Sequence, residues 1–255
     1  MFDSLPIDEV ETLMVELAHG STSEKTGAIV SEHLATGGKR LRARLVLAAS
    51  REFGVPFELA IPWAAACELL HNATLVHDDV QDGDETRRGQ PTTWVRHGTA
   101  SAINAGDLLL VLPTLAIERV NSDLSVRWHL ARQLAYQATR VIRGQVAEYE
   151  MTHHGPIDLN TYYNAIDGKT SPLFELPVIG AALLAGRAPE TAESLGAPFR
   201  SLGRLFQMQD DVLDLYGEKG RDQPGADIRE GKISAIVVTH LTQYPEEKTD
   251  VLEIL

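Results

Sequence analysis

The chain has 255 residues, and 36 acidic against 23 basic side chains give it a net charge of −13. So negative a chain is not expected to bind nucleic acid or an anionic membrane surface. Its single cysteine, Cys67, excludes an internal disulfide and fits a reducing cytoplasm. We find no basic segment followed by an apolar run at the start and no uninterrupted apolar stretch of ~18 residues, so we expect neither a signal peptide nor a membrane span.

Apolar residues recur at helical spacing along most of the chain. We expect helices over residues 6–19, 41–53, 57–82, 99–120, 124–152, 170–186 and 189–216, a short helix capped by Asp158 and ending at Ile166, and a last helix from Lys232. Pro113 predicts a kink. The polar segments 83–98 and 217–231 are expected to be loops, the first with a short helix. No strand alternation occurs, so the expected fold class is all-α, a single domain over residues 1–255 with about ten helices.

Two aspartate-rich motifs stand out, DDVQD at 78–82 and DDVLD at 210–214. Positions i and i+4 of a helix share a face and i+1 flanks it, so each motif places three carboxylates in a small volume. Like charges that close require a cation, and magnesium prefers oxygen ligands together with water and substrate phosphate. We therefore expect Mg2+ bridging to a diphosphate at Asp78, Asp79, Asp82, Asp210, Asp211 and Asp214. Either motif taken alone could equally be a solvated helix end.

Basic side chains occur near the first motif. The segment GGKRLR at 37–42 places Lys39 and Arg42 three positions apart, on one helix face. Arg87 and Arg88 follow the motif directly. Arginine contacts phosphate with a two-pronged fork and lysine with a point charge, so these residues could bind diphosphate. By themselves, both groups could also be ordinary solvated patches.

Four further residues are candidates because of where they fall in the helical pattern. His71 lies two helical turns before Asp78 on the same face. Lys169 and Thr170 precede a helix, and a helix N-terminus can bind an anion. Gln207 stands one turn before the second motif. Capping or surface roles explain each of these residues equally well from the sequence alone.

Taken together, these segments resemble the trans-isoprenyl diphosphate synthase family, also called polyprenyl synthetases. The resemblance covers nearly the whole chain, and its segments keep the family's order and spacing. They are GGKRLR (37–42), LLHNATLVHDDVQDGDETRRGQPT (69–92), AGDLLL (105–110), GQ (144–145), GKTSPLF (168–174), FQMQDDVLD (206–214) and GADIREGK (225–232). The resemblance implies an isoprenoid-synthase helix bundle around a deep central cavity, in a cytoplasmic homodimer.

The activity implied is the head-to-tail condensation of isopentenyl diphosphate with an allylic diphosphate, assisted by two or three Mg2+ ions. By matching position, isopentenyl diphosphate would be held by Lys39, Arg42, His71 and Arg88. The allylic diphosphate would be held by Arg87, Lys169, Thr170, Gln207 and Lys232. The carbocation left by its ionisation would be steadied by oxygen dipoles near Lys169, Thr170 and Gln207. No side-chain nucleophile is needed.

The chain departs from the family's pattern in three places. Ala43 stands where the family often has proline, and a lysine usual in the 217–231 loop is replaced by Arg221 or shifted to Lys219. Relatives usually add one or two helices beyond the position of Leu255, so we expect C-terminal helices to be missing here.

Product length in this family is set by side chains just before the first motif. Ala73 and Thr74 stand five and four residues before Asp78, and neither is aromatic. Small residues there resemble the synthases of longer products, with Leu70 and Cys67 as a possible floor of the cavity. We expect geranylgeranyl diphosphate or a longer product.

Two alternatives stay open. A class I terpene cyclase on the same fold also ionises an allylic diphosphate, but it does not need an isopentenyl diphosphate site. A non-catalytic regulatory subunit of a prenyl synthase typically loses acidic positions from its motifs, whereas both motifs are complete here. Consumption of isopentenyl diphosphate by the purified chain distinguishes a synthase from both.

Overall fold

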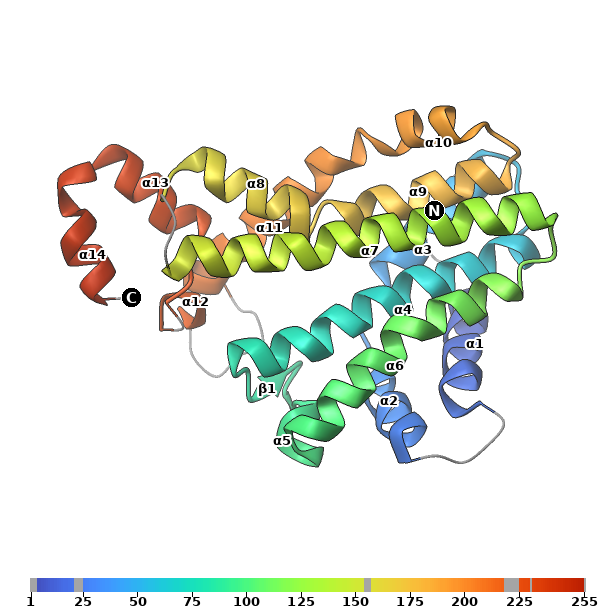
Figure 1. The fold of residues 1–255 in the computed structure, drawn as a ribbon, viewed down its shortest axis with the longest axis horizontal. Coiled ribbons are helices and arrows are strands. Elements are labelled where there is room, and N and C mark those ends of the chain that lie inside the picture. Colours follow the sequence, from blue (N-terminus) through green and yellow to red (C-terminus); the bar gives the residue numbers. More distant parts are fainter. Residues whose placement is uncertain (1–3, 21–24, 154–156, 218–224, 230, 255) are drawn as a thin grey trace. The chain divides into compact units, whose positions relative to one another are not determined.

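The computed structural model of the chain describes residues 4–20, 25–153, 157–217, 225–229 and 231–254. Nearly all the elements within these residues are helices (Figure 1). In chain order they are α1 (Ile7–His19), α2 (Lys25–Ala35), α3 (Leu41–Glu52), α4 (Phe57–Asp82), α5 (Thr93–His97), α6 (Thr99–Glu118), α7 (Leu124–His153), α8 (Leu159–Lys169), α9 (Pro172–Leu184), α10 (Pro189–Gly196), α11 (Phe199–Tyr216), α12 (Ala226–Arg229), α13 (Ala235–Gln243), the 3-10 helix η1 (Pro245–Glu247) and α14 (Lys248–Ile254). The expected all-α fold class is confirmed.

Contacts within the chain divide it into two compact units. Unit 1 comprises Met1–Tyr136 and Phe174–Ala197, and unit 2 comprises Gln137–Leu173 and Pro198–Leu255. The first aspartate motif lies in unit 1 and the second in unit 2. That the two units make a single domain stays a prediction.

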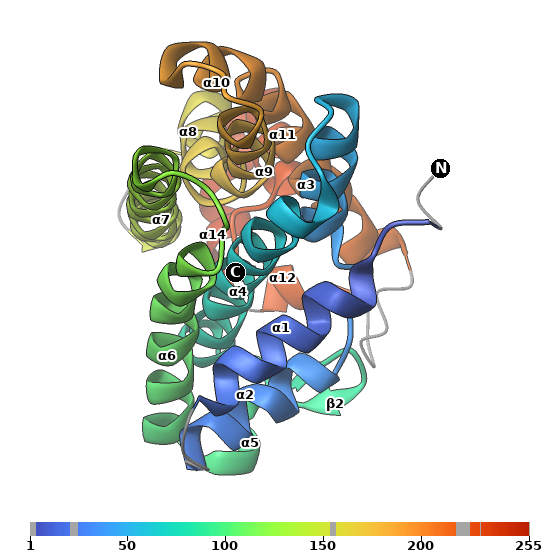
Figure 2. The ribbon, with the colours of Figure 1, turned by 90° about the vertical axis from the view of Figure 1, so that its right-hand side faces the viewer.

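The core of unit 1 is built around α4, which lies between α1, α3 and α6 (Figure 2). Its central residues are buried on every side because the sequence there is apolar all round the helix. Trp63 is fully buried, and its indole Nε1 donates to the Pro177 carbonyl at 3.4 Å. The indole lies against Gly180, where any Cβ would overlap the ring. This packing brings the apolar part of α4 against α9 of the same unit.

Unit 2 contains a second cluster of buried side chains from α7, α8 and α13. Its members are Met151, Tyr162, Ile166, Ile233, Ala235, Val237, Val238 and Leu241. Helix α8 begins where expected, because the Asp158 side chain caps it by accepting from the Thr161 N–H at 2.8 Å. The cluster fixes α8 beside the start of α13, and both positions matter for the second motif.

Several expected boundaries need correction. The segment 189–216 is two helices, α10 and α11, with Pro198 as the N-cap residue of α11. Helix α8 runs on beyond Ile166 to Lys169. Helix α13 begins at Ala235, near the expected Lys232, because the Ser234 side chain caps it. Helix α6 contains Pro113, as expected, and ends at Glu118 rather than at residue 120.

One short piece of sheet occurs where we expected no strand. The strands β1 (Thr86–Arg87) and β2 (Gln90–Pro91) pair antiparallel in the loop after the first motif. The tight turn between them contains Arg88 and Gly89, both at positive φ. Two-residue strands are too short to show an alternating pattern in the sequence.

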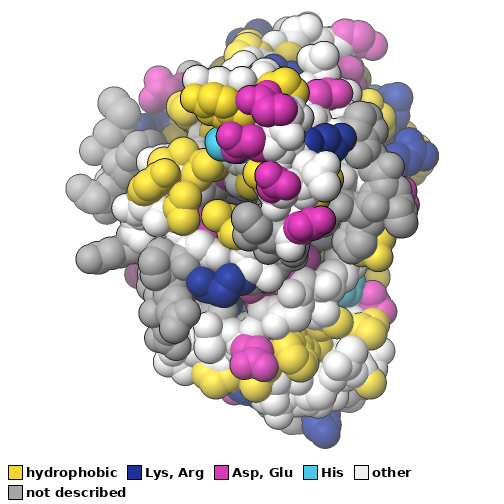
Figure 3. All heavy atoms as spheres, turned by 90° about the vertical axis from the view of Figure 1, so that its left-hand side faces the viewer, with side chains coloured by type: hydrophobic (Ala, Val, Ile, Leu, Met, Phe, Trp, Pro, Cys, Tyr) yellow, Lys and Arg dark blue, Asp and Glu magenta, His cyan; other side chains and the backbone are white. Residues whose placement is uncertain are grey.

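Helices α4 and α6 are long and apolar enough to cross a membrane by length and composition alone. The core helix of a soluble protein passes the same test, and α4 is mostly buried in its own unit. Acidic side chains are prominent on the face that includes α13 and α14 (Figure 3), in keeping with the net charge of −13.

Candidate active site

The first aspartate motif occupies the last turns of α4, which ends at Gly83 with φ 72°. Asp79 is buried, and its Oδ1 accepts from Arg87 Nε at 2.6 Å and Nη2 at 2.5 Å. Its other oxygen, Oδ2, is buried without a hydrogen-bond partner among the described residues. Burial raises the pKa of Asp79, and the bond to Arg87 opposes that rise. A buried carboxylate oxygen with no donor is suited to bind a cation.

The β1–β2 hairpin folds Arg87 back onto this motif. Arg87 Nη2 also lies 3.5 Å from Asp84 Oδ2, so the guanidinium stands between two carboxylates. Burial disfavours its charge, but the carboxylates outweigh burial and the pKa of Arg87 is raised. The adjacent Arg88 turns the other way and donates from Nη1 to the carbonyl of Gly37. Gly38 permits this approach, because a Cβ there would lie 2.8 Å from Arg88 Nη2.

Three of the four residues expected to hold isopentenyl diphosphate influence one another electrostatically. Burial, followed by the charges of Arg42, Arg87 and Arg88, keeps the pKa of His71 well below its usual value. The ring is therefore neutral near pH 7, and its buried Nδ1 has no hydrogen-bond partner among the described residues. Arg42 is buried with its guanidinium carbon 4.8 Å from the centre of the Phe174 ring. These residues offer positive charge and an imidazole to an anion.

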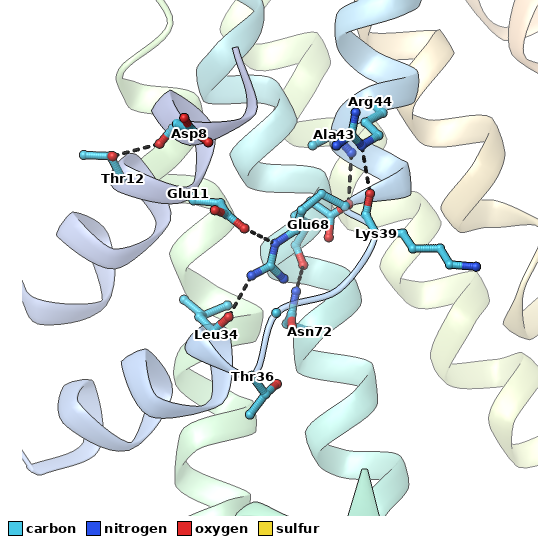
Figure 4. A network of polar contacts seen from close by, with 12 residues as sticks. Asp8, Glu11, Thr12, Leu34, Thr36, Lys39, Ala43, Arg44, Glu68 and Asn72 are labelled. Carbon is cyan, nitrogen blue, oxygen red and sulfur yellow. Dashed lines mark hydrogen bonds and ion pairs between the residues drawn. The ribbon is translucent and has the colours of Figure 1, made fainter. Parts of the chain in front are cut away.

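Lys39, the fourth residue, is exposed, and its side chain extends away from the polar network in Figure 4. Its neighbour Arg40 instead turns inward, with Nε 2.7 Å from Glu11 Oε1 and Nη2 2.7 Å from the Leu34 carbonyl. Arg40 adopts a left-handed backbone with φ 47°. Arg40 therefore fixes the 37–42 segment to α1 and α2 and leaves Lys39 in solvent.

Glu68 is a residue that the sequence reasoning missed. It is buried in α4, and its Oε1 accepts from the backbone N–H of Ala43 at 3.0 Å (Figure 4). The Glu68 charge also acts on Arg42, opposing the fall in pKa that burial causes. Ala43 stands where the family often has proline, and a proline would have no N–H to donate. The available signal was a charged residue inside an otherwise apolar helix.

The second aspartate motif occupies the last turns of α11. Both oxygens of Asp211 are engaged: Oδ2 accepts from Tyr162 Oη at 2.6 Å and from the Ala235 N–H at 2.7 Å, and Oδ1 accepts from Gln207 Nε2 at 2.9 Å. Burial raises the pKa of Asp211, and these three hydrogen bonds lower it. Asp214 Oδ2 accepts from the backbone N–H of Asp227 at 3.0 Å. The motif is thus bonded to α12, which lies inside the expected 217–231 loop, and to the start of α13.

Lys169 is the last residue of α8 and lies three residues before α9 begins at Pro172, so it stands between the end of one helix and the start of the next, as the sequence predicts. Its Nζ lies 2.5 Å from Glu148 Oε2 on α7. Thr170 donates to Gln207 Oε1 at 3.0 Å, so two residues expected at the allylic site are in contact. Glu148 is a second residue we missed; it lies one turn after the GQ segment.

The other expected residues lie as follows. Cys67, Leu70 and Ala73 are buried on α4, whereas Thr74 is half-buried and donates to the His71 carbonyl at 2.7 Å. Lys232 is half-buried between α12 and α13. Lys219 and Arg221 are outside the described residues.

The acidic side chains fit magnesium in chemistry. Among the described residues no three His, Cys, Asp or Glu side chains already form a metal-binding group. Magnesium commonly takes only one or two carboxylates and completes its shell with water and phosphate. Each motif is also at the C-terminal end of a helix, where the negative end of the macrodipole favours a cation. The expectation of magnesium at these residues remains a prediction.

An all-α protein with two such motifs and a buried basic group beside one of them belongs to the isoprenoid-synthase class. The polyprenyl synthetase family model matches residues 24–255, so the chain belongs to this family. The identification expected from the sequence motifs is confirmed.

Relatives and solved structures agree with the family. The chain is 38% identical over 229 residues to a short chain isoprenyl diphosphate synthase of Methanocaldococcus jannaschii, covering 88% of this chain and 69% of the relative. It is 35% identical over 205 residues to a geranylgeranyl diphosphate synthase of Methanosarcina mazei, covering 79% of this chain and 63% of the relative. A crystal structure of a geranylgeranyl pyrophosphate synthase superposes with a TM-score of 0.90 at 28% identity, over 100% of this chain and 77% of that one. These names support a trans-prenyltransferase activity.

Proposed function

We propose that the chain condenses isopentenyl diphosphate head to tail with an allylic diphosphate and releases diphosphate. The product is a linear polyprenyl diphosphate of geranylgeranyl length or longer. The observation that carries the proposal is the group around His71. A neutral imidazole, whose buried Nδ1 has no hydrogen-bond partner within the described part of the chain, lies there in the field of Arg42, Arg87 and Arg88. An enzyme that only ionised an allylic diphosphate would not need this second basic group.

Magnesium bound at the two motifs supplies charge neutralisation for the departing diphosphate. The ions would be held by Asp78, Asp79 and Asp82 and by the second motif. The buried oxygen Asp79 Oδ2 is suited to ligate one of them. Lys169, Arg87 and Lys232 bind the allylic diphosphate, while the oxygen dipoles of Thr170 and Gln207 stabilise the carbocation that ionisation leaves. Lys39, Arg42, His71 and Arg88 orient isopentenyl diphosphate so that its double bond attacks that cation.

Two ion pairs support an exchange of partners when substrate binds. Arg87 is paired with Asp79, and Lys169 is paired with Glu148. A bound diphosphate gives Arg87 and Lys169 a partner of higher charge than a carboxylate. A magnesium ion gives the carboxylates of Asp79 and Glu148 a new partner in turn. The pairs keep the charges compensated until both arrive.

Small residues support the product length. Ala73 is buried beside Leu70 and Cys67 on α4, with no aromatic ring among the three. A chain growing along this face of α4 therefore meets no aromatic ring at Ala73, and Leu70 and Cys67 would form the floor below it. The relatives named for geranylgeranyl diphosphate support the same range.

We propose that the protein is a cytoplasmic homodimer. Helix α6 carries the exposed apolar side chains Ile103, Val111 and Leu115, spaced for a single face of the helix. Exposed apolar stripes of this kind mark protein–protein contacts. The single buried cysteine fits the cytoplasm.

One incubation tests the activity. The purified chain is mixed with magnesium, radiolabelled isopentenyl diphosphate and each allylic primer in turn, and the labelled products are sized. We expect label in geranylgeranyl diphosphate or a longer product. Product from the allylic substrate alone would indicate a cyclase, and activity only after a partner synthase is added would indicate a regulatory subunit.

The Asp78→Ala variant tests the first motif in the same assay. Because the change removes a carboxylate from the expected ion site, we expect turnover to fall by at least about a hundredfold. Glu58→Ala, at the exposed opposite end of α4, is the matched control and should keep near-normal turnover. Near-normal turnover of Asp78→Ala would refute its metal role.

A further inference from the structure

Tyr162 is a buried residue that the proposed chemistry leaves unused. It lies on α8, and its hydroxyl donates to Asp211 Oδ2 at 2.6 Å. That distance is typical of a charge-assisted O–H···O⁻ bond. A phenol this deeply buried and this close to a motif residue contributes more than packing.

The Asp211 carboxylate collects donors from three different elements. Tyr162 belongs to α8, Gln207 to α11, and the Ala235 N–H to the start of α13. With two bonds to Oδ2 and one to Oδ1, this carboxylate is already well satisfied by the protein. Besides the metal role expected of it, Asp211 therefore joins these three elements.

Asp211 transmits this restraint to two residues of the allylic site. Because Gln207 Nε2 donates to Asp211, its Oε1 faces the Thr170 hydroxyl and accepts from it at 3.0 Å. On the other side, the bond to Ala235 fixes the chain three residues after Lys232. Loss of one donor would therefore disturb both the Gln207 amide and the approach of Lys232.

We propose that Tyr162 is a positioning residue that, through Asp211, sets the geometry of Gln207, Thr170 and Lys232 for the allylic diphosphate. The inference rests on the proposed function and deepens it. The Tyr162 hydroxyl is bonded to Asp211, whose other donors are Gln207 and Ala235, so the pair should affect the allylic half of the site and leave the isopentenyl half unchanged.

The test compares Tyr162→Phe with Tyr163→Phe. Both changes remove only a hydroxyl from neighbouring residues of α8, and Tyr163 is outside the Asp211 hydrogen bonds. For Tyr162→Phe we expect kcat to fall and the KM for the allylic substrate to rise, each about tenfold, as for loss of one hydrogen bond to a charged group. The KM for isopentenyl diphosphate should stay within about twofold, and Tyr163→Phe should match the wild type within about twofold.

Calorimetric titration gives a second readout that does not need turnover. With magnesium present, the affinity of Tyr162→Phe for inorganic diphosphate should fall about tenfold, and that of Tyr163→Phe should not change. In a double-mutant cycle, adding Tyr162→Phe to Asp211→Asn should cost less than adding it to the wild type, because the two side chains act as one pair.

Three results would overturn the inference: a folded Tyr162→Phe that behaves like Tyr163→Phe, additive losses in the cycle, or equal rises in both KM values. Circular dichroism checks folding, and failure of Tyr162→Phe to fold would also reject a positioning role in favour of a folding contact. A wild-type chain that transfers no prenyl group would instead refute the proposed function, and the titration would still report on the pair.

Discussion

At the scale of single residues, His33 shows how burial changes a side chain's chemistry. The ring is buried on α2, and its Nε2 lies 3.1 Å from Asn72 Oδ1. Burial, followed by the charges of Arg87 and Arg88, lowers the pKa of His33 to about 4 from 6.5. The folded protein therefore keeps His33 neutral at a pH where the unfolded chain protonates it.

The sign of the resulting pH dependence follows directly. Below about pH 6.5 the unfolded state binds a proton that the folded state refuses, so stability falls as the pH is lowered towards about 4. At about pH 5 we expect His33 to cost roughly 2 kcal/mol of unfolding free energy relative to neutral pH. Urea unfolding of the wild type and of His33→Gln at both pH values measures the difference.

Other groups also titrate in this pH range, so the effect of His33 is measured by comparing the wild type with His33→Gln. His33→Gln keeps a polar side chain near Asn72 but has no proton to gain. We expect its stability to depend less steeply on pH than that of the wild type. Equal slopes for the two proteins would show that His33 does not carry the effect.

At the scale of elements, the crossing of α7 and α8 depends on Gly144 of α7 and Gly168 of α8, which lie against each other. A Cβ at Gly144 would overlap the backbone of Gly168 and Lys169. On the other side, a Cβ at Gly203 of α11 would lie 2.6 Å from the Cα of Ser171. The 168–171 segment is thus packed between α7 and α11, close to the backbone of both helices. This packing fixes the position from which the Lys169 side chain extends.

Gly144→Ala tests this crossing. Alanine favours a helix over glycine by about 1 kcal/mol, so an uncrowded site would be stabilised. Here the methyl group must displace backbone, and we expect a net loss of roughly 1–3 kcal/mol in unfolding free energy. Urea unfolding measures it, with Arg143→Ala, an exposed neighbour, as control. A more stable Gly144→Ala would show that the crossing has room to spare.

The helix boundaries were predicted correctly where residues close together in the sequence determine them. Asp158 caps α8 as expected, and α4 spans the expected 57–82. The prediction failed at 189–216, where the apolar pattern continued across Pro198 and concealed the break between α10 and α11. Periodicity does not show a short break when the flanking faces remain in phase.

At the scale of the whole molecule, the exposed stripe on α6 predicts the oligomeric state. Val111 is 60% and Leu115 45% exposed, although both are large and apolar. Replacing both with glutamate places two charges on the proposed interface, so we expect the dimer to dissociate into monomers. Light scattering after size exclusion measures the mass.

The matched control is Val15→Glu, an exposed apolar residue of α1 in the same unit. It should leave the mass unchanged. If the wild type is a monomer, or if the α6 double variant stays dimeric, the assignment of this face to a second copy is wrong.

Periodicity and motif spacing are local properties of the chain, so they were enough to predict the helical class, the two aspartate motifs and the family. The sequence identified Arg42, His71, Lys169 and Gln207 as candidate site residues but did not show which residues each of them contacts. Folding was needed to show that Glu148 pairs with Lys169, that the Glu68 charge acts on Arg42, and that Tyr162 donates to Asp211. These partners are far apart in sequence and carry no spacing signal, since only packing brings a carboxylate within reach of its donor.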